Sequence, residues 1–152
     1  MRSMLPAVAA ALLTLVPIPA CASGLDDKVF DQQSLDALQA KVRLAQPRDL
    51  CFLYAQLVHE MTELSVRQYA AGDISNATNL LKQIQPLALK IHSSMVGGDK
   101  RLKDAEILLR HTSFRLTEML HSSSFEDRPL VEQTLAQVSQ AQNQAMLQVF
   151  SK

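Results

Sequence analysis

Apolar residues recur every three or four positions through most of the chain, the spacing that places them on one face of an α-helix. The longest unbroken run predicts a helix between Asp73 and Gly97, with the face Ile74, Ala77, Leu81, Ile84, Ala88, Ile91 and Met95. Asp73 suits the N-cap of this helix, and Gly72 suits the end of the helix before it. Pro86 should kink the helix, because proline lacks an N–H and clashes with the preceding turn.

Three further runs predict helices of similar length. A helix from about Arg48 to Ala71 has the face Leu50, Tyr54, Leu57, Met61, Leu64, Gln68 and Ala71. A helix from about Asp99 to Leu120 has the face Leu102, Ala105, Leu109, Thr112, Leu116 and Met119. The last helix has the face Val131, Leu135, Val138, Gln142, Ala145 and Val149.

The sequence also predicts how the last helix begins and what its outer side looks like. Ser124 and Asp127 have the spacing of a capping box at its start, with aspartate in place of the usual glutamate. The side away from its apolar face carries the glutamines Gln133, Gln137, Gln140 and Gln144. This composition predicts a neutral surface in contact with solvent.

A shorter helix precedes these four. Ser34 is its predicted N-cap, and the helix should end before Pro47, because the residue before a proline avoids the α region. Its apolar face is formed by Leu35, Leu38, Val42 and Ala45. Residues 23–33 are mostly polar and predict a tether.

No stretch of the chain alternates with a period of two, so the sequence indicates a single all-α domain over residues 34–152. Four long helices joined by short loops predict an up-and-down four-helix bundle with mostly antiparallel neighbours and a short extra N-terminal helix. A helical repeat is the alternative, although no second copy recurs at a fixed period.

Residues 1–22 have the pattern of a signal peptide. Arg2 precedes an apolar stretch over 7–16, which is too short to cross a bilayer, and Ala20-Cys21-Ala22 predicts cleavage before Ser23. The expected product is an exported protein, periplasmic or secreted. A competing interpretation is a lipobox, Ile18-Pro19-Ala20-Cys21, in which Cys21 is lipidated and anchors the protein to a membrane.

The charge and the cysteines exclude several classes. Lys plus Arg and Asp plus Glu number 15 each, so net charge gives no reason to expect nucleic acid binding. Two cysteines cannot build a disulfide framework. In a soluble exported form Cys51 is the single thiol, and its apolar neighbours Leu50, Phe52 and Leu53 predict a buried small hydrophobe.

The chain lacks the motifs of common catalytic and cofactor sites. There is no glycine-rich phosphate loop, no Cys-x-x-Cys-His and no Gly-x-Ser-x-Gly. Glu118 and His121 form a single Glu-x-x-His pair, whereas a di-iron bundle needs two. We therefore expect neither an enzyme nor a bound cofactor. A small haem- or metal-binding bundle is the alternative, since Met61, Met95 and Met119 lie on predicted faces.

Two helices carry a second stripe on the side away from their main face. The stripes are Phe52, His59 and Val66 with Tyr69 at the edge, and Ile107, Phe114 and His121. A peripheral helix buries one stripe, so a second stripe needs another partner. Either the N-terminal helix covers one stripe, or the stripes form a surface for a second copy or an envelope protein. The sequence thus favours an exported, non-enzymatic bundle that binds or scaffolds a macromolecule in the cell envelope.

Overall fold

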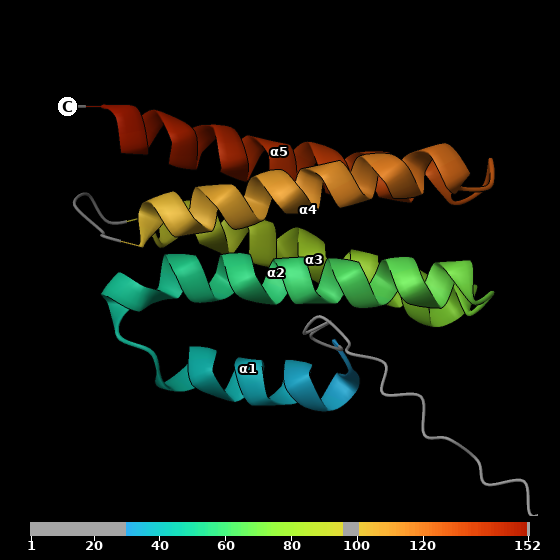
Figure 1. Ribbon diagram of the computed structural model, residues 1–152, viewed down its shortest axis with the longest axis horizontal. Helices are drawn as coiled ribbons and strands as arrows, with labels where there is room; N and C mark the ends of the chain where they lie inside the picture. Colours follow the sequence, from blue (N-terminus) through green and yellow to red (C-terminus); the bar gives the residue numbers. More distant parts are fainter. Residues whose placement is uncertain (1–29, 96–100, 152) are drawn as a thin grey trace, which may run out of the picture.

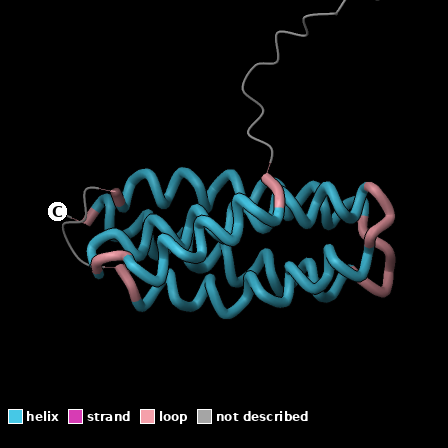
Figure 2. The backbone as a smooth tube through the Cα atoms, turned by 90° about the horizontal axis from the view of Figure 1, so that it is seen from below, coloured by secondary structure: helices cyan, strands magenta, loops and turns pink. Residues whose placement is uncertain are grey.

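The computed structural model describes residues 30–95 and 101–151, and within these ranges it contains five helices and no strand. The helices are α1 (Gln32–Leu44), α2 (Pro47–Ala70), α3 (Ile74–Ser93), α4 (Leu102–Ser122) and α5 (Arg128–Phe150), as Figures 1 and 2 show. The predicted all-α class is confirmed. The predicted signal peptide, Cys21 and Gly97-Gly98 lie outside the described residues. None of the described helices is both long and apolar enough to cross a membrane.

The four long helices form two hairpins that stack side by side. Helix α2 packs on α3 and α4 packs on α5, while α2 also packs on α4 and α3 on α5. The hairpins point the same way (Figure 1), so α2 and α4 are parallel neighbours. Contacts between them advance together along both helices, from His59 with Thr112 to Glu63 with Arg115. The prediction of antiparallel neighbours therefore holds within each hairpin and is wrong between them.

Helix α1 packs on α2 and runs antiparallel to it (Figure 1). It begins before the predicted N-cap, because Asp31 performs that role. An Asp31 carboxylate oxygen accepts the N–H of Ser34 at 2.8 Å, and the Ser34 hydroxyl oxygen accepts the N–H of Asp31 at 3.2 Å. The last two residues of the predicted tether, Gln32 and Gln33, therefore belong to the helix.

The predicted core faces of α3 and α4 are confirmed in their central turns. On α3, five predicted positions are buried: Ala77, Leu81, Ile84, Ala88 and Ile91. On α4, all six predicted positions from Leu102 to Met119 are buried. Pro86 lies inside α3 as expected, and Gly72 takes the positive φ of 84° that ends the α2–α3 turn.

The predicted face of α2 holds in part: Leu57 and Met61 are buried, and Tyr54 and Leu64 are half-buried against the core. The remaining buried residues of α2 centre on a different side, with Cys51, Ala55, Val58, Thr62 and Ser65. Helix α2 has three neighbours, so it is buried around much of its circumference and no single stripe marks its core side. Small residues such as these let helices approach closely, and the Ser65 hydroxyl donates to the Ala77 carbonyl of α3 at 2.9 Å. The burial predicted for Cys51 is confirmed.

Helix α5 follows its prediction in part. Val131, Val138 and Ala145 are buried, but Leu135 and Gln142 are only half-buried, and Thr134 and Ala141 take their places in the core. The glutamines divide as well. Gln133 and Gln140 are exposed, whereas Gln137 and Gln144 are half-buried beside α3 residues, because the packing of α3 on α5 extends onto that side of the helix.

Candidate functional site

The second stripe of α2 lies against the flank of α4. Phe52, His59, Val66 and Tyr69 are all half-buried. The guanidinium carbon of Arg101 sits 3.6 Å from the centre of the Phe52 ring, at the start of α4. Helix α4 therefore provides the main partner of this stripe, in place of the N-terminal helix that was one expected cover.

Tyr69 joins the end of α2 to the loop between α4 and α5. Its hydroxyl donates to an Asp127 carboxylate oxygen at 2.9 Å and accepts the N–H of Ser124 at 2.9 Å. The predicted capping box is thereby modified. Ser124 and Asp127 do bond to each other, at 2.7 Å, but Tyr69 rather than Asp127 binds the Ser124 N–H, and α5 begins only at Arg128. Sequence spacing could not reveal a partner 55 residues away.

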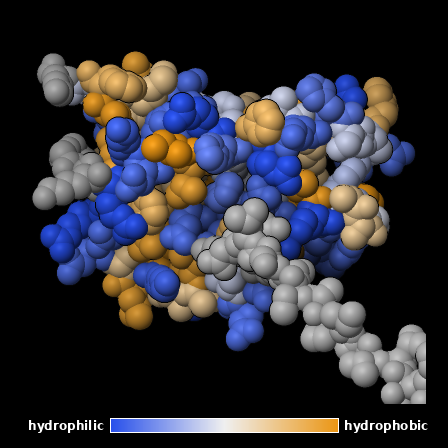
Figure 3. Space-filling model, viewed as in Figure 1, coloured by the Kyte–Doolittle hydropathy of each residue, from blue (hydrophilic) through white to orange (hydrophobic). Residues whose placement is uncertain are grey.

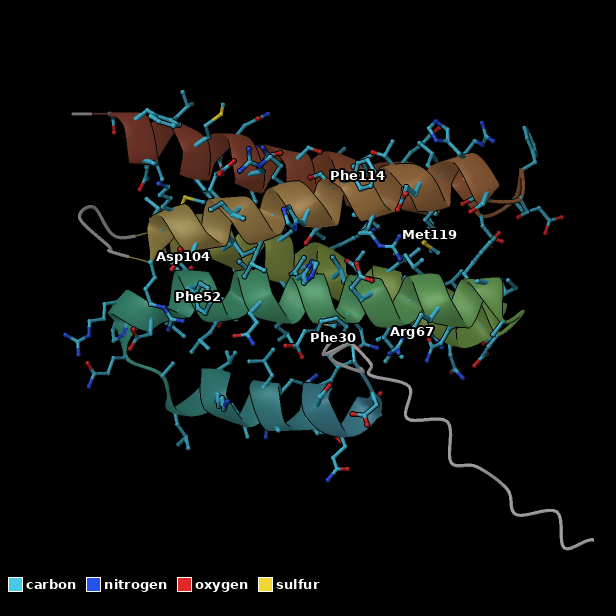
Figure 4. The ribbon with its side chains drawn as sticks, viewed as in Figure 1. Phe30, Phe52, Arg67, Asp104, Phe114 and Met119 are labelled. Atoms are coloured by element: carbon cyan, nitrogen blue, oxygen red, sulfur yellow. The ribbon has the colours of Figure 1, made fainter. Side chains whose placement is uncertain are left out.

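The stripe of α4 faces away from the bundle. Phe114 is 63% exposed, His121 is exposed and Ile107 is half-buried. Figure 4 shows Phe114 on α4, with α2 lying between that helix and α1. Helix α1 therefore does not cover this stripe, and Phe114 instead shares the hollow between α2 and α4 with His59 of the other stripe.

His59 is the most constrained polar residue between α2 and α4. Its Nδ1 lies 3.0 Å from the Thr112 hydroxyl oxygen, and that hydroxyl donates to the Leu108 carbonyl at 2.8 Å. Nδ1 must then be the donor, which leaves Nε2 as an acceptor. The Phe30 ring meets His59 edge-on, with 5.9 Å between ring centres. Because the Thr112 hydrogen is committed to a carbonyl, the pair lacks the hydroxyl-to-imidazole bond of an activated nucleophile.

Burial lowers the pKa of His59 below its usual range, against a smaller opposing effect of Glu63. The Glu63 carboxylate accepts from Arg115 Nε at 2.8 Å, and Arg115 also bonds to Glu118. The hydrogen bond to Glu63 raises the pKa of Arg115. These carboxylates are thus engaged by a cation. Within the described residues, no three His, Cys, Asp or Glu side chains gather as metal ligands do.

This region forms an open hollow of about 740 Å³ between α2 and α4, lined by His59, Glu63, Arg110, His111, Phe114 and Arg115. Glu63 is the one acidic residue in this lining, beside Arg110 and Arg115. Both arginines are paired, Arg115 with Glu63 and Glu118 and Arg110 with Glu106, so neither offers an unpaired charge to a ligand. Its neighbouring surface is mixed: Figure 3 shows apolar patches separated by hydrophilic residues. The largest exposed apolar side chains near the end of α5 are Leu147 and Phe150.

A second hollow, missed from sequence, lies between α1 and α3. This groove of about 610 Å³ has a floor on α2 formed by Leu50, Tyr54, Leu57 and Met61. These residues were assigned to the bundle core because they share one helical face. Leu57 and Met61 do belong to the core, whereas Leu50 and Tyr54 are half-buried and line the groove, so one helical face serves both and periodicity could not distinguish the two cases.

We expect acid to destabilise the protein through His59. The unfolded chain binds a proton near the ordinary histidine pKa of about 6.5, while the buried ring binds it only at lower pH. The free energy of unfolding should therefore be constant above this value and fall as the pH drops through it. His59→Asn keeps a donor towards Thr112 without titrating and should flatten this dependence, as measured by urea denaturation at several pH values. His92→Asn, on the exposed side of α3, is the control, and equal slopes in both variants would contradict the assignment.

The two hollows and the α4 stripe are the candidate sites, and known proteins add no precedent for them. No family model matches the chain, and it is similar to no curated protein and to no solved structure.

Proposed function

We propose that the protein is an exported, non-enzymatic helical bundle of the cell envelope that binds a macromolecular partner through the outer face of α4. The observation that supports this is Phe114, which is 63% exposed midway along a helix whose opposite face is fully buried. Ile107 and His121 continue the same stripe one heptad to either side. An exposed aromatic side chain in such a stripe is typical of an interface anchor.

The partner that this face fits is a second copy of the chain. Phe114 lies seven residues from both Ile107 and His121, so the stripe is symmetric about it. If two α4 helices pair in antiparallel fashion, Phe114 meets Phe114 near the two-fold axis, and Ile107 of each copy lies opposite His121 of the other. This is the self-complementary arrangement of an isologous dimer. Heptad spacing suits the shallow crossing of such a helix pair.

Phe114→Ser should dissociate this dimer. Loss of an aromatic anchor costs about 2 kcal/mol or more in binding, which weakens dimerisation roughly thirtyfold. The measurement is sedimentation velocity of the wild-type protein and the variant at neutral pH.

Phe125→Ser is the matched control, since Phe125 is exposed in the α4–α5 loop and lies outside the stripe. Phe52→Ser is a second control: its ring stacks under Arg101, so the substitution should lower thermal stability. Self-association is contradicted if the wild-type protein is a monomer, or if Phe114→Ser and Phe125→Ser dimerise equally.

A further inference from the structure

The groove between α1 and α3 is polar at one end and apolar along its floor. Because α1 and α3 both run antiparallel to α2 (Figure 1), Arg43 and Lys90 lie at the end where α2 begins. The Lys90 ammonium lies 6.0 Å from the centre of the Tyr54 ring, which fixes its place at this end. The uncharged Gln39 and Gln83 line the opposite end. The groove therefore has a cationic end and a neutral end.

The polar groups at the cationic end are available to a ligand. Within the described residues, neither Arg43 nor Lys90 forms an ion pair, and the Tyr54 hydroxyl makes no hydrogen bond. No acidic residue lines the groove. Two cations and a hydroxyl thus line the same groove without an acidic residue among its lining residues, and a carboxylate is the simplest group that could bind to all three.

The rest of the groove suits one hydrocarbon chain. Its α2 lining runs from Leu50 to Met61, which at 1.5 Å per residue is about 16 Å. Leu50 and Tyr54 are half-buried, and Leu57 and Met61 form the buried base of the deeper part. Its volume of about 610 Å³ lies within the range of small-molecule sites, roughly 300–1,000 Å³. An extended acyl chain matches a narrow floor made by a single helix, since apolar contact along its length needs no directional partners.

We propose that this groove binds a medium-chain fatty acid. Its carboxylate lies between Arg43, Lys90 and the Tyr54 hydroxyl, and its chain follows α2 towards Met61. The charge pattern favours this occupant over a cationic or neutral amphiphile. The groove is on the far side of α2 from the α4 stripe, so this binding is independent of the proposed dimer.

Isothermal titration of the full-length protein with dodecanoate, below the concentration at which it forms micelles, tests the proposal. We expect saturable binding of one dodecanoate per chain, and binding at least tenfold weaker for dodecanol and for dodecyltrimethylammonium. The double substitution Arg43→Glu with Lys90→Glu should weaken dodecanoate binding at least tenfold. Tyr54→Phe, which keeps the floor apolar, should weaken it by a smaller factor.

Lys41→Glu with Lys103→Glu is the matched control, because it reverses the same number of exposed charges on α1 and α4 outside the groove. Circular dichroism of each variant verifies that the fold is kept. The proposal is overturned if dodecanoate does not bind, if the ammonium amphiphile binds equally well, or if the groove and control variants lose affinity alike. Monomeric and dimeric preparations should bind equally, which separates this test from that of the α4 interface.

Discussion

Ile84→Asp should unfold the protein. Ile84 is fully buried at the centre of α3, on the face that packs into the bundle. An aspartate there leaves a buried carboxylate without a partner, at a cost of about 3–5 kcal/mol. Domains of this kind are stable by only about 5–15 kcal/mol in total. We expect the melting temperature, followed by circular dichroism, to drop by at least about 10 °C.

Gln133→Asp is the control for this substitution. Gln133 is exposed in the second turn of α5, where an added acidic group faces solvent. Gln137, which the sequence pattern also placed on the outer side, is unsuitable: it is half-buried, and its side-chain oxygen accepts no hydrogen bond from the described residues. Equal melting temperatures for Ile84→Asp and Gln133→Asp would show that the core is placed incorrectly.

Leu38→Asp should release α1 and leave the two hairpins folded. Among the described helices, α1 packs on α2 alone, and Leu35 and Leu38 are the buried residues of α1. Each buried leucine contributes about 1.5–3 kcal/mol, and ordering the 13 residues of α1 opposes this gain. The loss of one leucine should therefore make the packing of α1 on α2 unfavourable. Trypsin should then cleave rapidly after Lys41 and Arg43, while hydrogen exchange in α3 and α5 stays slow.

Ala37→Asp tests whether this effect depends on burial. Ala37 is on the same helix but exposed, so its substitution should leave α1 protected from trypsin. Continued protection of α1 in Leu38→Asp would contradict the prediction. Simultaneous loss of protection in all five helices would do so as well, because it would make α1 an integral part of the bundle.

The sequence predicts helix positions better than helix partners. The faces of α3 and α4 are predicted well because each helix has two packing neighbours and so buries one stripe. Helix α2 touches three helices, and its interior side is formed by small or polar residues such as Ala55, Thr62 and Ser65, which no apolar pattern marks. The start of α1 was missed because Asp31 and Ser34 both suit an N-cap, and only the backbone decides between them.

The candidate sites also differ in how far the sequence alone predicts them. The exposure of Phe114 follows from its position opposite the apolar face of α4, which the sequence contains. The contact between Tyr69 and the α4–α5 loop and the groove beside Tyr54 do not follow, because both depend on which helices lie next to α2. Local periodicity describes one helix at a time, whereas these features arise between helices.

The two hairpins point the same way and stack side by side, an arrangement to which further hairpins can be added at either edge. At one edge of this row, α1 lies alongside α2 and occupies the place where a further hairpin would stack. The other edge is formed by the sides of α4 and α5 that face away from α2 and α3, and no helix of the described chain lies against it. Helical arrays need a polar terminal unit to stay soluble. In this protein α1 covers one edge of the row and leaves the other edge uncovered. Two copies joined at their uncovered edges would form a row of four hairpins, with an α1 helix covering each end.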